Sequence, residues 1–186
     1  MSFFNRRKFL SFGAAALASG PAFASTSTYE VPAHMQPRIV DILDKFAAGE
    51  IHVDPGQFAL YWTLPGGKAI RYPVGIGRAK RYIPGTFTVR RKAEWPRWTP
   101  TKAMIKREPH LYAKHANGMA GGGMNPLGAR ALYLYSGGRD TYLRIHGTPK
   151  PQTVEARVSN GCVRMINEQV IDLYNRVPIG TRVVLH

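Results

Sequence analysis

The sequence predicts a mostly β domain with one or two short helices covering the sheet. After position 50, glycine or proline interrupts the chain about every eight to twelve residues, which is the spacing of turns in β-rich domains. Two pairs of strand-like segments flank glycine-containing turns. A segment after position 166 instead repeats its apolar residues at helical spacing, so at least one helix is expected beside the sheet.

Size and composition fit one globular domain. The chain has 186 residues, of which 44% are apolar and 20% charged, and this is enough to bury a single core. The formal net charge of +15 favours anionic partners such as nucleic acid, anionic lipid or an anionic wall polymer. The basic residues are scattered, so a solvated basic surface is an equal alternative. Nucleic-acid binding is disfavoured, because the sequence has no basic helix and no aromatic–basic motif.

Residues 1–24 have the pattern of an export signal. Arg6 to Lys8 are basic, residues 9–18 are weakly apolar, and residues 22–24 read Ala-Phe-Ala, which is a cleavage-site pattern. The apolar stretch is too short for a stable membrane anchor. The arginine pair followed by Phe9 resembles a twin-arginine signal, with an ordinary secretory signal as the alternative. Either signal predicts export to the periplasm or cell envelope.

Residues 25–50 are expected to form a linker and a short N-terminal helix ahead of the main domain, which spans 51–186. Residues 25–37 are polar and contain two prolines. From residue 38 onward, apolar side chains recur at helical spacing until Gly49 ends the pattern. The apolar positions are Ile39, Ile42, Leu43, Phe46 and Ala47.

The main domain is predicted to consist mainly of strands. The expected strands are 57–63, 68–76, 85–91, 131–136, 141–147 and 182–186. The first two flank Leu-Pro-Gly-Gly, and the fourth and fifth flank Gly-Gly-Arg-Asp, so each pair predicts a hairpin. One helix is expected late in the chain, with Asn167 as its N-cap and Pro178 after its end.

A long irregular region, 92–130, separates the third strand from the fourth. Connections of this length in compact domains often line or cover a functional site. Trp95 and Trp98 lie within it. Because indole rings are rarely left in water, we expect these two side chains to fix the region to the domain.

His146 lies at the end of the predicted strand 141–147. Leu143 and Ile145 alternate there with Tyr142, Arg144 and His146, so the histidine shares a polar face with a tyrosine and an arginine. A histidine on the polar face of a strand end is typical of a cleft. A surface histidine without function is the alternative at this stage.

Cys162 is the only cysteine of the chain. A lone cysteine is by default a small buried residue, but Ser159 to Gly161 have the composition of a turn. Arg164 is expected to favour the thiolate, and the amides of Gly161 and Cys162 are candidate donors to an oxyanion. A metal site is not expected, because the five other histidines show no ligand spacing with this cysteine.

The motifs IHGT (145–148) and SNGCVRM (159–165) resemble the signature of the L,D-transpeptidase catalytic domain, the YkuD-type family. Further stretches upstream are similar to the same family, so the resemblance covers about residues 51–186. These stretches are 83–89, 95–100 and 121–134. The resemblance implies a YkuD-type mixed β-sandwich or barrel-like catalytic domain.

The resemblance also implies roles for particular residues. Cys162 matches the nucleophile and His146 the general base. Gly161 and Cys162 match the oxyanion-stabilising backbone, Arg164 a carboxylate-binding arginine, and Ser159 a residue that supports the loop. Asn160 stands where many members have a second histidine, and an amide does not titrate near neutral pH. The substrate-groove candidates are Trp95, Trp98, Tyr142 and Arg144. No cofactor and no metal are implied.

The function implied by the resemblance is that of an exported enzyme acting on peptidoglycan stem tetrapeptides through a thioester. The acyl acceptor is left open between another stem, an envelope lipoprotein, a D-amino acid and water, and water would make the enzyme an L,D-carboxypeptidase. A catalytic thiol also explains the absence of a second cysteine, with which it would form a disulfide. The alternatives are a non-catalytic peptidoglycan-binding module of the same fold and an exported cysteine peptidase.

Overall fold

The computed structural model describes residues 29–186. The export signal predicted over residues 1–24 and its cleavage site lie outside the described residues. Within residues 29–186, none of the helices combines the length and apolarity that crossing a membrane requires.

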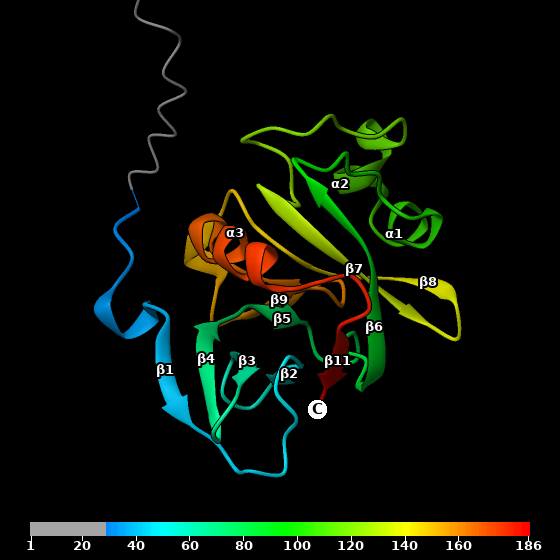
Figure 1. The fold of residues 1–186 in the computed structure, drawn as a ribbon. Helices are drawn as coiled ribbons and strands as arrows, with labels where there is room; N and C mark the ends of the chain where they lie inside the picture. The colour runs from blue at the N-terminus through cyan, green and yellow to red at the C-terminus, as the bar shows by residue number, and fades with distance from the viewer. Residues whose placement is uncertain (1–28) are drawn as a thin grey trace, which may run out of the picture.

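The described residues form a large mixed sheet. Its strands are β1 (Arg38–Asp41), β2 (Ile51–Asp54), β3 (Ala59–Leu64), β4 (Lys68–Pro73), β6 (Gly85–Glu94), β7 (Arg130–Ser136), β8 (Arg139–His146), β10 (Val163–Arg164) and β11 (Arg182–Leu185). Their order in this nine-stranded sheet of the described residues is β1-β4-β3-β2-β11-β6-β7-β8-β10 (Figure 1). The pairs β2–β11 and β8–β10 are parallel, and the others are antiparallel. The mostly β prediction is therefore confirmed.

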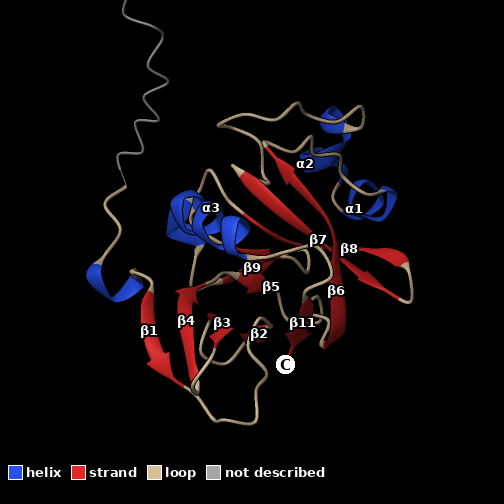
Figure 2. Ribbon diagram, in the orientation of Figure 1, coloured by secondary structure: helices blue, strands red, loops and turns tan. Residues whose placement is uncertain are grey.

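A smaller parallel pair, β5 (Ile76–Gly77) with β9 (Arg157–Ser159), forms a second sheet. The short helices are α1 (Lys102–Arg107), α2 (Pro109–Tyr112) and the 3₁₀ turns η1 (Ala33–Met35), η2 (Ala113–His115) and η3 (Pro151–Thr153). The longest is α3 (Asn167–Arg176), which packs on β7. Figure 2 shows α3 between β4 and β7, with α1 and α2 on the opposite side of the strands from η1.

Both predicted hairpins are present, as β3–β4 and β7–β8. The C-terminal strand pairs with β6 on one side and with β2 on the other. Strand β2 was not predicted, because its four residues are too few to display a period. Ile51 and Val53 are fully buried there, so this short strand lies at the centre of the core.

The helix predicted after residue 38 is wrong. Residues 38–41 form the edge strand β1, which pairs antiparallel with β4, and turns follow as far as Gly49. The β-branched Ile39 and Val40 favour a strand, and β4 offers them a row of unpaired backbone groups. Ile39 and Leu43, which the helical pattern placed on a buried face, are each 64% exposed.

Helix α3 confirms the predicted C-terminal helix but not its cap. Ile166 is the N-cap residue and Asn167 is the first helical residue. The side-chain Oδ1 of Asn167 instead accepts a hydrogen bond from the backbone N–H of Ala129, at 3.0 Å. Val170 and Leu173 are fully buried, so the helix is held to the sheet by its apolar face and by this polar contact.

The region expected to be irregular, 92–130, carries more structure than predicted. Strand β6 extends to Glu94, and α1, α2 and η2 follow within residues 102–115. The amide of Asn125, which is 1% exposed, donates hydrogen bonds to the carbonyls of Pro96, Met119 and Ala120. We call residues 95–128 the covering segment, because they lie over one end of β7 and β8 (Figure 1).

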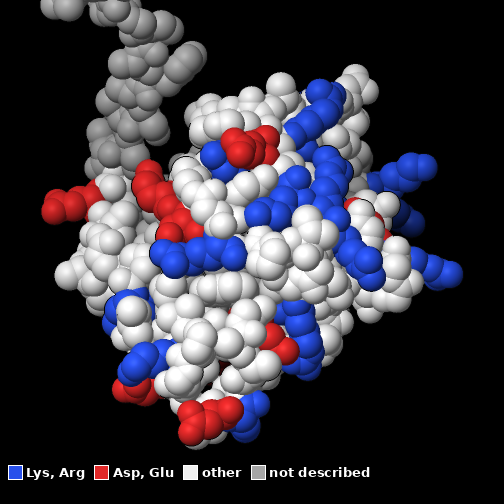
Figure 3. Space-filling view, in the orientation of Figure 1, with Lys and Arg blue, Asp and Glu red and all other residues white. Residues whose placement is uncertain are grey.

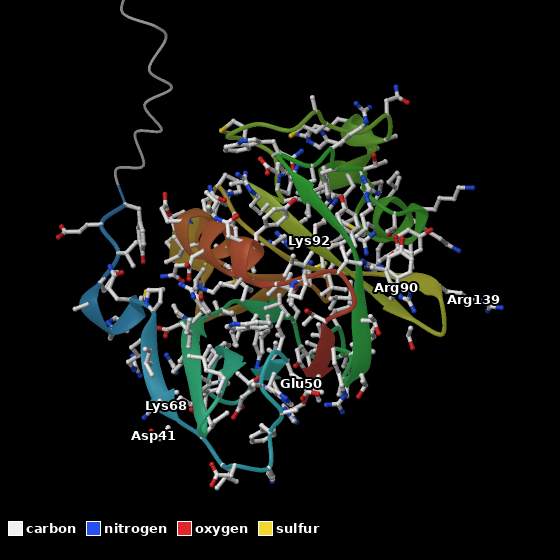
Figure 4. The ribbon with its side chains drawn as sticks, viewed as in Figure 1. Asp41, Glu50, Lys68, Arg90, Lys92 and Arg139 are labelled. Carbon is white, nitrogen blue, oxygen red and sulfur yellow. The ribbon has the colours of Figure 1, made fainter. Side chains whose placement is uncertain are left out.

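Lys92 fastens strand β6 to the C-terminal end of α3. A β-bulge between Val89 and Arg91 shifts the register of β6, so Lys92 follows Val89 on the inner face. Its ammonium donates to the carbonyls of Tyr174 and Val177, at 2.6 and 2.7 Å. Figure 4 shows Lys92 on the side of β6 that faces α3. A cation at the last carbonyls of a helix also complements the helix dipole.

Replacing Lys92 with methionine is expected to lower the free energy of unfolding by about 1–3 kcal/mol, because two helix-end carbonyls lose a charged donor. The change is measured by urea denaturation followed by circular dichroism. The control is Lys106→Met, at an exposed position of α1, which should stay within about 0.5 kcal/mol of the parent. Equal stability of the two variants would show that the contact contributes nothing.

Candidate active site

A groove of about 930 Å³ separates the covering segment from β7, β8 and β10. Eight of the ten predicted site residues line it: Cys162, His146, Arg164, Asn160, Ser159, Arg144, Tyr142 and Trp98. Gly161 lies beside it in the loop of residues 160–162 between β9 and β10, which we call the cysteine loop. A second hollow of about 600 Å³, between β1–β4 and residues 42–46, contains none of the predicted residues.

Trp95 does not join this group. It is 46% exposed and adopts a positive φ of 40° directly after β6, and it is not among the residues that line the groove. Its expected place in the groove is therefore corrected. Trp98 does face the groove, where its ring lies 6.2 Å from that of Tyr112 and 5.7 Å from that of His115.

His146 is the last residue of β8 and is only 4% exposed. Its Nδ1 lies 2.6 Å from the carbonyl oxygen of Gly147. Because a carbonyl can only accept, Nδ1 carries the proton and Nε2 is the unprotonated nitrogen. The pKa of His146 is lowered to about 3, mainly by burial and then by the charges of Arg164 and Arg144, whereas the hydrogen bond to the Gly147 carbonyl acts in the opposite direction. The imidazole is therefore neutral at neutral pH.

Gly147 is required by the approach of α3. A Cβ at this position would overlap the Oδ1 of Asn167, the atom that binds the backbone of Ala129. The backbone of β8 and the first turn of α3 can therefore meet only if residue 147 lacks a side chain. This close packing holds the carbonyl that sets the tautomer of His146.

Cys162 stands directly before β10, whose parallel pairing places Val163 opposite Ile145 and Arg164 opposite His146. The residue as a whole is partly exposed, and its Sγ lies 3.7 Å from the carbonyl oxygen of Tyr142. The register of β8 shifts at this point, and Tyr142 adopts a positive φ of 60°. The distortion of β8 thus brings backbone atoms of the strand to the cysteine.

The thiol of Cys162 is protonated in the resting site. Burial raises its pKa, and this effect outweighs the hydrogen bond from the backbone of Arg144 and the positive charges of Arg144 and Arg164. Arg164 does act in the direction expected from the sequence, but desolvation prevails. The resting pair is therefore a neutral thiol and a neutral imidazole.

Ser159 stabilises the cysteine loop through two hydrogen bonds of its hydroxyl. Its hydroxyl donates to the carbonyl of Cys162, at 2.6 Å, and accepts from the N–H of Gly161, at 3.1 Å. The N–H of Gly161 is therefore occupied by Ser159 in this structure, and its expected role as an oxyanion donor stays a prediction. The N–H of Cys162 remains for that purpose, without a hydrogen-bond acceptor among the residues that the structure describes.

Gly161 is needed for its backbone conformation. Its φ is +131°, and a Cβ there would come within 3.0 Å of the carbonyl oxygen of Arg81. Only glycine satisfies both conditions at low cost.

Asn160 connects the cysteine loop to the covering segment. Its Oδ1 accepts from Arg107, at 2.9 Å, and from Arg78, at 3.4 Å, and its Nδ2 donates to the hydroxyl of Tyr112, at 2.9 Å. Arg78 also contacts Glu108 between the two short helices. We call this set the Asn160 clasp. The sequence contained no signal for these partners, because they lie far from Asn160 in the chain.

Two arginines reach the groove with different partners. Arg144 forms a two-point ion pair with Asp140, at 2.7 and 2.8 Å, and lies over the ring of Tyr133. Arg164 donates to the hydroxyl of Thr153, at 3.0 Å, while its buried Nε has no partner among the described residues. The guanidinium of Arg164 is thus the one of the two that is left for an external anion.

Comparison with known proteins agrees with this geometry. Residues 48–185 match the model of the YkuD family, described as the L,D-transpeptidase catalytic domain. The chain is 38% identical over 140 residues to the probable L,D-transpeptidase ErfK/SrfK of Escherichia coli K12, covering 72% of this chain and 42% of that protein. It therefore spans less than half the length of that relative. It is 30% identical over 191 residues to a putative L,D-transpeptidase of Fuscovulum blasticum, covering 96% of each.

Two solved structures are also similar. A Brucella melitensis chain named a probable carnitine operon oxidoreductase is 45% identical, with a TM-score of 0.58, and the match covers 86% of this chain and 99% of that one. L,D-transpeptidase 3 of Mycobacterium tuberculosis, solved with a faropenem-derived adduct, is 18% identical, with a TM-score of 0.55 over 73% of this chain and 59% of that one. The second likeness concerns the fold alone.

The name of the Brucella protein differs from those of the curated relatives. The family match covers well over half of this chain and includes His146 at the end of β8 and Cys162 before β10. On this evidence, the chain belongs to the L,D-transpeptidase catalytic domain family.

Proposed function

We propose that this protein is an exported L,D-transpeptidase that acts on peptidoglycan stem tetrapeptides, with Cys162 as the nucleophile and His146 as the general base. One observation carries the proposal. The carbonyl of Gly147 fixes His146 in the tautomer whose Nε2 can accept a proton, and this ring lines the same groove as the thiol.

Acylation begins from the neutral pair. As the sulfur of Cys162 attacks the carbonyl carbon of the third stem residue, its proton passes to Nε2 of His146. The N–H of Cys162 donates to the oxyanion that develops on the substrate oxygen. The C–N bond to D-alanine then breaks, the imidazolium returns the proton to the leaving amine, and a thioester remains on Cys162.

Deacylation repeats the proton transfers in reverse. An acceptor amine loses a proton to His146 and attacks the thioester, and the thiol is regenerated. The candidate amines are the diamino acid of another stem, a lysine of an envelope lipoprotein and a free D-amino acid. Water as the acceptor would give L,D-carboxypeptidase activity instead.

The pattern of residues 1–24 supports a location in the periplasm or cell envelope. A single cysteine is compatible with such an oxidising compartment, because the chain holds no second thiol with which it could form a disulfide. The Asn160 clasp supports an enzyme over a non-catalytic wall-binding module, since it gives the asparagine a positioning role that needs no titration.

The proposal is tested by the intact mass of the protein after exposure to a carbapenem. An active thiol should gain one adduct, and Cys162→Ser should gain none. An unmodified parent protein would favour a non-catalytic binding module. Release of D-alanine from a stem tetrapeptide, measured by liquid chromatography with mass detection, then identifies the donor substrate.

Alanine substitutions at His146 and at Asn160 should lower the activity to different extents. His146→Ala is expected to lower kcat for the tetrapeptide by about 10²- to 10⁴-fold, because the thiol loses its proton acceptor. Asn160→Ala should lower kcat/KM by only about 2- to 10-fold, because it loosens the clasp without removing a proton carrier.

The matched control is His110→Ala, at an exposed position of α2 outside the groove, which should retain parent activity. A larger loss of kcat in Asn160→Ala than in His146→Ala would refute the assignment of the base.

The pH dependence of acylation follows from the two pKa shifts. The pKa of His146 is lowered to about 3, so the base is neutral well below neutral pH, and the raised pKa of Cys162 keeps the thiol protonated above it. The fraction of the protein in which both groups are neutral is therefore nearly constant between about pH 5 and pH 8. The acylation rate should vary less than about twofold over this range. An acid limb centred near the ordinary histidine value of about 6.5 would contradict this.

A further inference from the structure

The groove is lined by positive charge and by no acidic residue. Among its lining residues in the described part of the chain are six Lys and Arg side chains and not one Asp or Glu. The basic residues are Arg91, Arg97, Lys114, Arg144, Lys150 and Arg164. Figure 3 shows that Lys and Arg also gather on the outer surface near β6 and α1, whereas Asp and Glu lie mainly on the opposite side of that face.

Two of these charges share one carboxylate inside the protein. Arg144 is paired with Asp140 through both carboxylate oxygens. Arg91 lies over the ring of Tyr133, 4.4 Å from its centre, and its charge also acts on Asp140. Arg91, Arg144 and Asp140 thus form a compact cluster at one wall of the groove.

The other four cations have no carboxylate partner among residues 29–186. Arg97 donates to the carbonyl of Asn117, Arg164 donates to a threonine hydroxyl, and no ion pair involves Lys114 or Lys150. Arg164 is the deepest of the four, with a buried Nε that lacks any partner.

These four residues come from different parts of the fold. Arg97 and Lys114 belong to the covering segment, Lys150 follows the end of β8, and Arg164 belongs to β10. The positive charge of Arg164 acts to lower the pKa of the Cys162 thiol. A cleft with cations on several walls and no compensating anion concentrates anionic ligands and orients them.

We infer that the groove selects stem peptides whose carboxylates are free and discriminates against the same peptides with those carboxylates converted to amides. The inference rests on the proposed function and specifies its donor substrate. In a stem tetrapeptide with γ-linked glutamate at the second position and diaminopimelate at the third, these two residues carry free carboxylates that can be amidated, and D-alanine carries another. An amide keeps the shape of the group but removes the charge that the four cations would meet.

The test compares two disaccharide tetrapeptides that differ only by amidation of these two carboxylates. The measured quantity is kcat/KM for release of D-alanine. The free-carboxylate peptide should be used about 5- to 20-fold more efficiently, since each partly exposed charge pair contributes a few-fold. This preference should shrink as sodium chloride is raised, because salt screens the exposed cations.

Variants at the groove rim locate the effect. Lys114→Gln and Lys150→Gln should each raise KM for the free-carboxylate peptide by about two- to fivefold and change KM for the amidated peptide less, because that peptide keeps only the D-alanine carboxylate. The control is Lys106→Gln, an exposed lysine of α1 outside the groove, which should change neither value.

Equal use of the two peptides, or a preference for the amidated one, would overturn the inference while leaving the proposed function intact. A different result separates the two proposals. If neither peptide is turned over while the carbapenem still acylates Cys162, the proposed donor substrate is wrong and the inference falls with it.

Discussion

The parallel pairing of β8 with β10 is the contact on which the site depends. The end of β8 and the two-residue strand β10, separated in sequence by the turn of η3 and by β9, are aligned so that Arg164 lies opposite His146. The loop that carries Cys162 enters this pairing directly, beside the distorted stretch of β8 at Tyr142. Gly147 permits α3 to pack against the same strand end, because any side chain there would overlap Asn167. Shifting the register by one residue would move the imidazole to the other face of the sheet and out of the groove.

Desolvation determines the electrostatic state of this pair. Burial disfavours both the thiolate and the imidazolium, so it raises the pKa of Cys162 and lowers the pKa of His146. Arg144 and Arg164 lower both pKa values, but the thiol and the imidazole still stay neutral rather than forming a thiolate–imidazolium ion pair. In the proposed reaction, the thiolate of Cys162 would therefore form only as a substrate carbonyl accepts the developing charge. A protonated thiol is also less open to oxidation, because the thiolate is the reactive species.

The covering segment joins the groove to the cysteine loop through few polar contacts. Asn125 organises the segment internally through three backbone carbonyls, and the Asn160 clasp fixes it to the residue two places before Cys162. A histidine at position 160 could reproduce only part of this set, since a neutral imidazole has one acceptor lone pair, whereas Oδ1 of Asn160 accepts from both Arg107 and Arg78. The segment also supplies Arg97 and Lys114 to the groove wall, so its position influences both the access to the thiol and the charge that a substrate meets.

The sequence by itself determined the mostly β class, both hairpins, the C-terminal helix and the two residues at the centre of the proposed chemistry. These follow from local patterns: turn residues between apolar segments, strand alternation, and the motifs around His146 and Cys162. Only the tertiary structure decided that residues 38–41 form an edge strand, that the N–H of Gly161 is occupied, that the thiol is protonated and that Asn160 binds Arg107 across 53 residues of chain. Each of these depends on partners that are distant in sequence or on the loss of water around a group, and neither has a signature in the order of the residues.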